Sequence, residues 1–268
     1  MENPFRMLEV VKRWYDIPTW MKVFAFNALP IAYVIAELYD GYIGWLALGP
    51  GGLPYNFKGY LTNLLLTAVY AKRDTTSLEP YGKPEKHAVG WQEATADEKE
   101  NAQKSFFGKS LSTRAGPQSK AKSYCAPQRE HNANRPVDPE VKKTYLEGLD
   151  KLMDKYSDAL EWSTSLLEMH GQAVFLRSSF AVPTLISKCQ REVAHIHESD
   201  LSAHVLLSFD DAKSTIEQGW GERHRLTGTA MLPLGYTLLY APRDREEVEV
   251  FLRIFEAGIE YAKSSGKN

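Results

Sequence analysis

The alternation of apolar and polar residues divides the chain into an apolar beginning, a polar middle and a mixed C-terminal part. No charged residue occurs in the fourteen positions from Val23 to Ala36. A helix needs about 20 apolar residues to cross a bilayer, so this shorter stretch predicts a helix buried in the core. A helix on a membrane surface and a helix packed against a second subunit are the alternatives. Residues 60–72 are also mostly apolar and predict a further helix.

The middle of the chain, from Arg73 to about Asn134, is polar and poor in valine, isoleucine and leucine. This composition predicts a long connection on the surface, ordered in part through Trp91, Phe106 and Phe107. Loops of this length are uncommon in compact domains and often have a function, for example as lids.

The last 130 or so residues have patterns of both helices and strands. The segment Pro136–Pro139 begins a predicted helix, and apolar residues then recur at spacings of three and four up to Leu160. A further helix is predicted to begin at Asp210 and end near Gly219, and the last one is predicted to be capped by Asp244. Strands are predicted at residues 173–176, 191–197, 203–208 and 235–240.

This order of elements predicts an α+β fold, in which helices pack on a mixed, mainly antiparallel sheet and an N-terminal helical part precedes it. We divide the chain into a helical segment with a Gly-Pro-Gly-Gly turn (residues 1–72), a long polar connection (73–135) and an α+β domain (136–268). We expect the three to form one compact unit.

Composition and charge exclude several classes of protein. The chain has 268 residues and a net charge of −2, which is not the charge of a nucleic-acid-binding protein. Its two cysteines, Cys125 and Cys189, form neither a disulfide framework nor a zinc pattern, and predict a reducing, cytoplasmic location. A phosphate-binding loop and a dinucleotide-binding glycine motif are both absent from the sequence, so we expect no cofactor.

The densest group of chemically versatile residues lies between residues 195 and 204. His195 and His197 share one face of a predicted strand, and the turn that follows brings His204 back beside them. Structural histidines, a metal site and the polar wall of a small-molecule pocket are three interpretations of this group. We favour the pocket wall and expect no metal, because the sequence shows no evident acidic fourth ligand.

The run Gly219-Trp220-Gly221-Glu222-Arg223-His224 is the second candidate. A solvated loop seldom places a tryptophan between two glycines, so the run predicts a binding role.

The third candidate is Tyr240-Ala241-Pro242-Arg243, at the end of a predicted strand. Arg243 is either an ion-pair partner of a helix carboxylate or an anchor for a carboxylate of the substrate.

These motifs together resemble the fungal luciferase-domain family. The resemblance includes Ala194-His195-Ile196-His197, the run from Gly219 to His224, the segment from Tyr240 to Arg243 and, upstream, the segment from Leu46 to Pro54. It implies an enzyme of fungal natural-product biosynthesis.

We therefore expect a cofactor-independent enzyme that cyclises or isomerises an apolar, oxygenated molecule. An intramolecular Diels–Alderase (pericyclase) acting on a terpenoid or polyketide is the example we favour. The candidate catalytic residues are His195, His197, His204, His224 and Arg243. The candidate substrate-binding residues are Trp220, Glu222, Arg223 and Tyr240. A non-catalytic binding protein for a lipophilic metabolite and a histidine–metal enzyme are the alternatives. We expect an apolar small molecule and no nucleic acid as partner, with membrane contact and a homodimer as less favoured alternatives.

Overall fold

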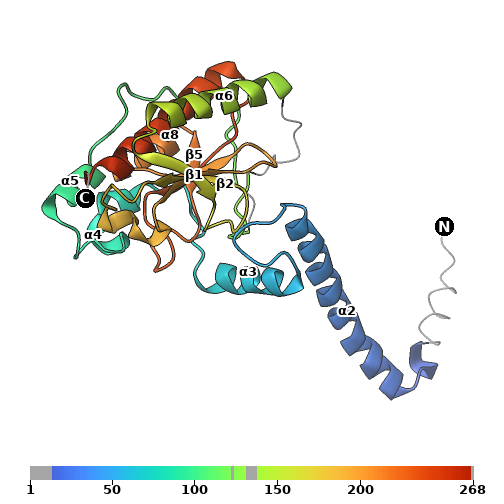
Figure 1. Ribbon diagram of the computed structural model, residues 1–268. Helices are drawn as coiled ribbons and strands as arrows, with labels where there is room; N and C mark the ends of the chain where they lie inside the picture. The colour runs from blue at the N-terminus through green and yellow to red at the C-terminus, as the bar shows by residue number, and fades with distance from the viewer. Residues whose placement is uncertain (1–13, 122–123, 131–137, 267–268) are drawn as a thin grey trace. The chain divides into compact units, whose positions relative to one another are not determined.

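The computed structural model describes residues 14–121, 124–130 and 138–266 (Figure 1). Contacts between residues divide the chain into two units, Met1–Ala47 and Leu48–Asn268. Pro136 and Val137, at the predicted start of one helix, lie outside the described residues.

The first unit contains the helix α2 (Thr19–Leu46), which includes the helix predicted from Val23 to Ala36 and extends beyond it at both ends. The prediction that this helix is buried is wrong. The large apolar side chains of the predicted stretch are exposed, for example Phe24 by 70% and Leu29 by 71%, whereas Trp45 near the end of α2 is buried. Apolar residues surround the whole helix instead of forming one stripe, so α2 has no single face to pack on a core. Among the described residues, α2 is the one helix long and apolar enough to cross a membrane.

The second unit is built around an antiparallel sheet, which confirms the predicted α+β class. Its described strands follow the spatial order β1-β2-β3-β4-β6-β5, and every neighbouring pair is antiparallel. The bounds are β1 Leu160–Thr164, β2 Gln172–Leu176, β3 Glu192–Ile196, β4 Ala203–Leu206, β5 Gly221–Arg223 and β6 Tyr236–Leu239.

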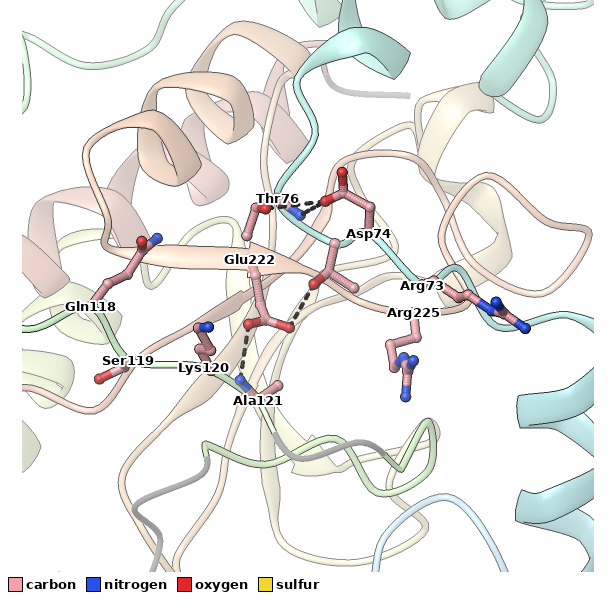
Figure 2. A pocket seen from close by; sticks show the side chains of 10 residues that line it. Arg73, Asp74, Thr76, Gln118, Ser119, Lys120, Ala121, Glu222 and Arg225 are labelled. Atoms are coloured by element: carbon pink, nitrogen blue, oxygen red, sulfur yellow. Dashed lines mark hydrogen bonds between the residues drawn. The ribbon is translucent and has the colours of Figure 1, made fainter.

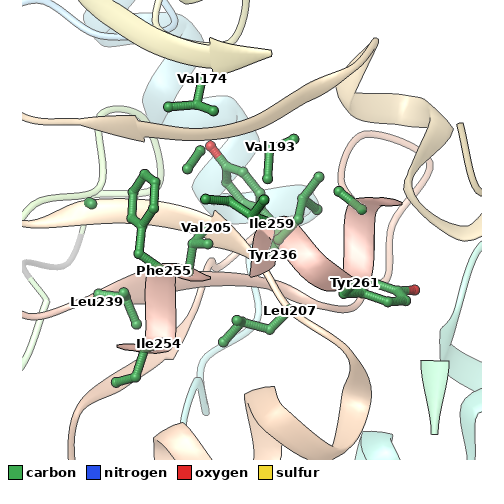
Figure 3. Packing of buried hydrophobic residues seen from close by; sticks show 14 of the residues in the cluster. Val174, Val193, Val205, Leu207, Tyr236, Leu239, Ile254, Phe255, Ile259 and Tyr261 are labelled. Atoms are coloured by element: carbon green, nitrogen blue, oxygen red, sulfur yellow. The ribbon is translucent and has the colours of Figure 1, made fainter. Parts of the chain in front are cut away.

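The helices α6 (Pro139–Lys155) and α8 (Arg245–Lys263) cover one face of this sheet (Figure 1). Figure 3 shows Phe255 and Ile259 of α8 beside Val205 of β4, within the main apolar core. The core thus lies between α8 and the sheet. The predicted cap of α8 is present, because Asp244 accepts a hydrogen bond from the backbone N–H of Glu247. A shorter helix, α7 (Phe209–Glu217), begins at its cap Ser208 and packs against β5.

The polar connection after α3 (Phe57–Val69) is more ordered than its composition predicts. It contains the short helices η1 (Glu79–Gly82), α4 (Pro84–His87) and α5 (Ala96–Ala102), and a capping box begins α5. Ser105 donates a hydrogen bond to Asp211 at 2.6 Å, and Arg114 pairs with Glu247 at 2.8 Å, which fixes this segment to α7 and α8. Further along, Ala121 donates its backbone N–H to Glu222 of β5 at 2.9 Å.

Two strands were not predicted from the sequence. The helical pattern expected to reach Leu160 ends at Lys155, and Leu160 instead begins β1. The run expected to be a binding loop contains β5, which is short and pairs with β6.

Candidate functional site

The pairing of β3 with β4 brings three histidines together on the sheet. His195 lies opposite His204, and His197 follows at the end of β3, where its backbone N–H donates to Ser202. The ring centroids of the three histidines lie 4.8–5.2 Å apart. Their strand neighbour Val205 faces α8, so the alternation along a strand places the histidines on the opposite face. The predicted return of His204 beside His195 is confirmed.

Outer partners determine which ring nitrogen of His195 and His197 carries a proton. Nδ1 of His195 lies 2.6 Å from Oε1 of Glu192, and a carboxylate only accepts, so Nδ1–H donates. Nδ1 of His197 lies 2.7 Å from the hydroxyl of Ser202, which in turn donates to Asp200 at 2.7 Å. With Asp200 ionised, Nδ1 of His197 is a donor as well, although burial raises the pKa of Asp200. In the neutral form of either ring, Nε2 is then a lone-pair acceptor.

His204 is oriented by a glutamine from the polar connection. Its Nε2 lies 3.2 Å from Oε1 of Gln128. The amide NH₂ of Gln128 donates to Glu222 and to the carbonyl of Arg223, so the amide oxygen faces His204. Nε2 of His204 therefore donates, and its Nδ1 is the acceptor.

The inward nitrogens of the three histidines face one another, and the carboxylate of Glu168 lies beside them. Nδ1 of His204 lies 3.1 Å from Nε2 of His197 and 3.1 Å from Nε2 of His195. Oε1 of Glu168 lies 3.5 Å from Nε2 of His195, while its Oε2 pairs with Arg129 at 2.5 Å. One ligand atom from each of Glu168, His195, His197 and His204 lies within 4.8 Å of those of the other three. We call these four residues the histidine–glutamate cluster.

Burial controls the charge of the cluster. It lowers the pKa of His197 and His204 well below the usual value, and the positive charge of Arg129 lowers both further. His195 behaves differently. Burial alone lowers its pKa, but hydrogen bonds to Glu168 and Glu192 outweigh this effect and raise it.

Two further residues stand beside the cluster. His224, the fourth predicted histidine, has its ring centroid 5.1 Å from that of His204. Its Nδ1 accepts the backbone N–H of Leu226, and burial lowers its pKa to about 3. Tyr236 stacks on His204, with an interplanar angle of 8°.

A pocket of about 240 Å³ reaches the cluster from the surface. Arg129, Glu168 and His197 form its polar inner part, and Leu48, Pro50 and Ile196 contribute apolar walls. An ion pair and a neutral imidazole thus meet in a partly apolar pocket, which is typical of small-molecule sites.

The Gly-Pro-Gly-Gly turn presses against this pair of charges. A Cβ atom on Gly51 would lie 2.4 Å from Oε2 of Glu168 and 2.9 Å from Nη2 of Arg129. Arg129 also donates to the backbone carbonyl of Pro50 at 3.1 Å, and Gly52 donates its N–H to the carbonyl of Glu168. The turn therefore holds the inner end of the pocket in place.

A second cleft, of about 560 Å³, is strongly polar (Figure 2). Glu222 lies at its edge and accepts hydrogen bonds from Ala121, Thr75, Tyr240 and Gln128. With four donors already around it, this carboxylate holds the polar connection on the sheet. Through Gln128 it also fixes the orientation of His204.

Three of the other predicted site residues lie away from the cluster. Trp220 donates its indole N–H to the carbonyl of Ser112 at 2.7 Å. Arg223 donates to the carbonyl of Asp74 at 2.7 Å. Arg243 pairs with Glu247 at the start of α8, as in one of its two interpretations. A fourth predicted site residue, Tyr240, donates a hydrogen bond from its hydroxyl to Glu222. Catalytic or substrate-binding roles for these four residues stay predictions.

Sequence reasoning missed Glu168, Glu192, Gln128 and Arg129. The last two are only 1% and 2% exposed although they come from a polar segment. Gln128, Arg129 and Glu168 reach the histidines through long-range packing, so no local pattern marks them. Glu192 is only three residues from His195, and this short spacing is the one signal that could have found it.

A family model and several known proteins match the chain. A family model described as "Luciferase domain" matches residues 190–258, a range that includes His195, His197 and His204. The luciferase of Neonothopanus nambi is 30% identical to the chain, over 82% of the chain and 79% of the relative. The luciferase of Armillaria mellea is 28% identical, over 95% of the chain and 93% of the relative. No solved structure matches the chain significantly.

These relatives point to a small-molecule enzyme, and none of those compared is named as a Diels–Alderase. The match to the Neonothopanus luciferase extends over most of both chains and is not confined to the histidine strands. The chain therefore belongs to the fungal luciferase-domain family.

Proposed function

We propose that the protein is an enzyme that oxidises a small, oxygen-bearing organic molecule with molecular oxygen at the histidine–glutamate cluster. The observation that carries the proposal is the inner end of the 240 Å³ pocket, where Arg129, Glu168 and His197 converge. Burying an ion pair beside a neutral imidazole is costly for folding, and such groups concentrate where a reaction needs them.

The relatives support oxidation as the reaction class. The names of the proteins from Neonothopanus and Armillaria denote light-emitting enzymes, and light emission of this kind accompanies oxidation of an organic substrate. Three of the four cluster residues lie within the matched luciferase domain.

The pocket residues supply what such an oxidation requires. The guanidinium of Arg129 binds an oxygen atom of the substrate as it gains negative charge. A neutral imidazole, His197, accepts the proton of the C–H bond that breaks. The electron pair of that bond forms the new C–O bond to O₂, and His197 returns the proton to the terminal oxygen, so that the product is a hydroperoxide. The substrate supplies both electrons, so neither a nicotinamide nor a flavin takes part.

The Diels–Alder closure expected from the sequence is a second candidate. Such a closure needs a shaped cavity and one donor for a carbonyl group. Arg129, at the inner end of a partly apolar pocket, supplies a positive charge for that carbonyl, although its Nη groups already donate to Glu168 and to backbone carbonyls.

One experiment separates the candidates. The purified protein is incubated under ¹⁸O₂ with the luciferin of the Armillaria enzymes and with small-molecule fractions of a fungal extract, and products are identified by mass spectrometry. We expect a product that contains ¹⁸O, and a decrease of roughly 100-fold or more in its formation for His197→Ala. His87→Ala, outside the cluster, is the matched control.

Other outcomes contradict the oxidation. A product with the mass of the substrate and no ¹⁸O supports the cyclisation instead. Stoichiometric binding without turnover supports the binding protein and overturns both enzymatic proposals.

The location of the enzyme is a separate proposal: it works at a membrane surface, anchored by α2. The exposed apolar residues of α2 support this. A second support is the helix α3, where Phe57, Leu61, Leu65 and Val69 follow a spacing of four and are all exposed.

A further inference from the structure

We propose that Glu168, His195, His197 and His204 bind one divalent ion of a first-row transition metal. The proposal departs from the expectation of a metal-free site, which rested on the lack of an acidic fourth ligand near the histidines. Glu168 supplies that ligand from the turn between β1 and β2.

The first argument is an account of protons and lone pairs. The outer partners Glu192, Ser202 and Gln128 take one N–H from each of the three histidines. The inward nitrogens are then three lone pairs, separated by 3.1 Å at two contacts that share Nδ1 of His204. Whichever group bonds to Nε2 of His195, Nε2 of His197 and Nδ1 of His204 still face each other at 3.1 Å, whereas one metal ion satisfies all three nitrogens.

The second argument is distance. Ligand atoms placed about 2.0–2.1 Å from one ion are separated by about 2.9 Å in cis octahedral geometry and about 3.3 Å in tetrahedral geometry. Three of the six separations in the cluster are 3.1 Å, 3.1 Å and 3.5 Å, and all six lie within 4.8 Å. Small movements of the four side chains would therefore bring them into the arrangement they would have around an ion.

The third argument is the shell of partners around the ligands. Metal-binding histidines usually donate their other N–H to a carboxylate, a carbonyl or another fixed acceptor, which orients the ring. Glu192 and Gln128 do this directly, and Ser202 does so with support from Asp200. Arg129 donates to both oxygens of Glu168, at 2.5 Å to Oε2 and 3.3 Å to Oε1, and so fixes the carboxylate with Oε1 3.5 Å from Nε2 of His195.

The ligand set also selects the class of metal and leaves it accessible. Three imidazoles and one carboxylate suit iron, manganese, cobalt, copper or zinc, whereas calcium and magnesium prefer oxygen ligands only. Two of the four ligands, Glu168 and His197, line the pocket. An ion in the cluster would therefore have its open positions on the side from which the substrate enters.

The test measures metal without any substrate. The full chain is produced with a tag that contains no histidine, purified without chelator, and analysed by inductively coupled plasma mass spectrometry. We expect about one first-row metal ion per folded chain. We also expect metal-depleted protein to bind one Co²⁺ and to gain the visible absorption bands of a nitrogen- and oxygen-ligated ion.

Two variants and two controls locate the ion. His197→Ala and His204→Ala should each lower Co²⁺ affinity at least 100-fold. His87→Ala and His224→Ala should bind Co²⁺ like the wild type, although His224 touches the cluster. Because the Co²⁺ titration of the wild-type chain needs no variant, loss of folding in a variant leaves the test decisive.

Three results would overturn the inference: wild-type protein that holds less than about a tenth of an ion per chain and takes up no Co²⁺, binding that survives in the cluster variants, or equal loss in His224→Ala. The inference shares its site with the proposed function, and an ion bound to Nε2 of His197 would occupy the lone pair that the proposed oxidation uses as its base. Turnover by metal-free protein would support His197 as the base and leave the ion without a part in the reaction, while metal binding without turnover would support the ion and contradict the oxidation.

Discussion

The substitution Gly51→Ala tests whether the Gly-Pro-Gly-Gly turn positions the inner end of the pocket. The added Cβ would lie 2.4 Å from Oε2 of Glu168, 2.7 Å from Cβ of Pro127 and 2.9 Å from Nη2 of Arg129. Ordinary contact begins near 3.4 Å, so Glu168 must retreat by about 1 Å or the turn must lift.

Both stability and activity should change. Overpacking of this kind costs roughly 1–3 kcal/mol, which corresponds to a decrease in Tm of roughly 2–12 °C for a domain of this size. A displacement of 1 Å at a positioned catalytic group costs roughly 100-fold in rate. We therefore expect a folded protein with a lower Tm, weaker Co²⁺ binding and much slower turnover, measured by differential scanning calorimetry, titration and product formation.

The matched control is Gly108→Ala. A Cβ on Gly108 would meet nothing within 4 Å, so its Tm and turnover should stay near those of the wild type. If Gly51→Ala matched the wild type in all three measurements, the turn would have no part in positioning Glu168 and Arg129.

Three further predictions concern other parts of the chain. Burial alone raises the pKa of Glu247, but hydrogen bonds from Arg114 and Arg243 outweigh it and lower the pKa from 4.5 to about 2. The stability that Glu247 contributes is therefore complete above about pH 5 and lost as the pH falls toward 2, so the Tm difference between wild type and Glu247→Gln should shrink between pH 6 and pH 3. Glu192→Gln should lower turnover roughly 10- to 100-fold because it weakens the acceptor that orients His195, and His87→Gln should leave turnover unchanged. The full chain should float with phosphatidylcholine vesicles in a density gradient. Leu29→Lys in α2 should lower the floating fraction of the protein more than Asn27→Lys does, and equal flotation of both variants would contradict a membrane role for Leu29.

Local patterns were sufficient to predict most of the sheet. The strands β2, β3, β4 and β6 are continuous apolar or alternating runs bounded by turns, and such runs need no knowledge of distant residues. The strand β5 escaped prediction because it has three residues, two of them charged, and is defined by pairing with β6. Its charged residues are buried only because the polar connection covers them.

The helix α2 shows the opposite failure. Its apolar character was evident, but burial was inferred from the length of the uncharged stretch alone. The helix continues through Glu37 and Asp40 to Leu46, so its true length could not be read from the position of the charges.

Within the site, geometry inside one hairpin could be predicted and geometry across the fold could not. The period of two along a strand placed His195 and His197 on one face, and the short turn returned His204 to them. Glu192 is a different case. Simple alternation along β3 places its side chain on the other face of the sheet from His195. The two side chains nevertheless meet, where the register between β2 and β3 shifts between Val174 and Phe175.

Folding alone does not account for the residues gathered beneath the pocket. Removing the charges of Glu168 and Arg129 from water is costly, and apolar residues of similar volume often stabilise a fold as well or better. Facing lone pairs on the buried His197 and His204 add a further unfavourable contribution, while the apolar core between α8 and the sheet is complete without them. An arrangement that stability does not favour, held by Gln128, Glu192 and a glycine turn from three distant parts of the chain, is best explained by what it binds.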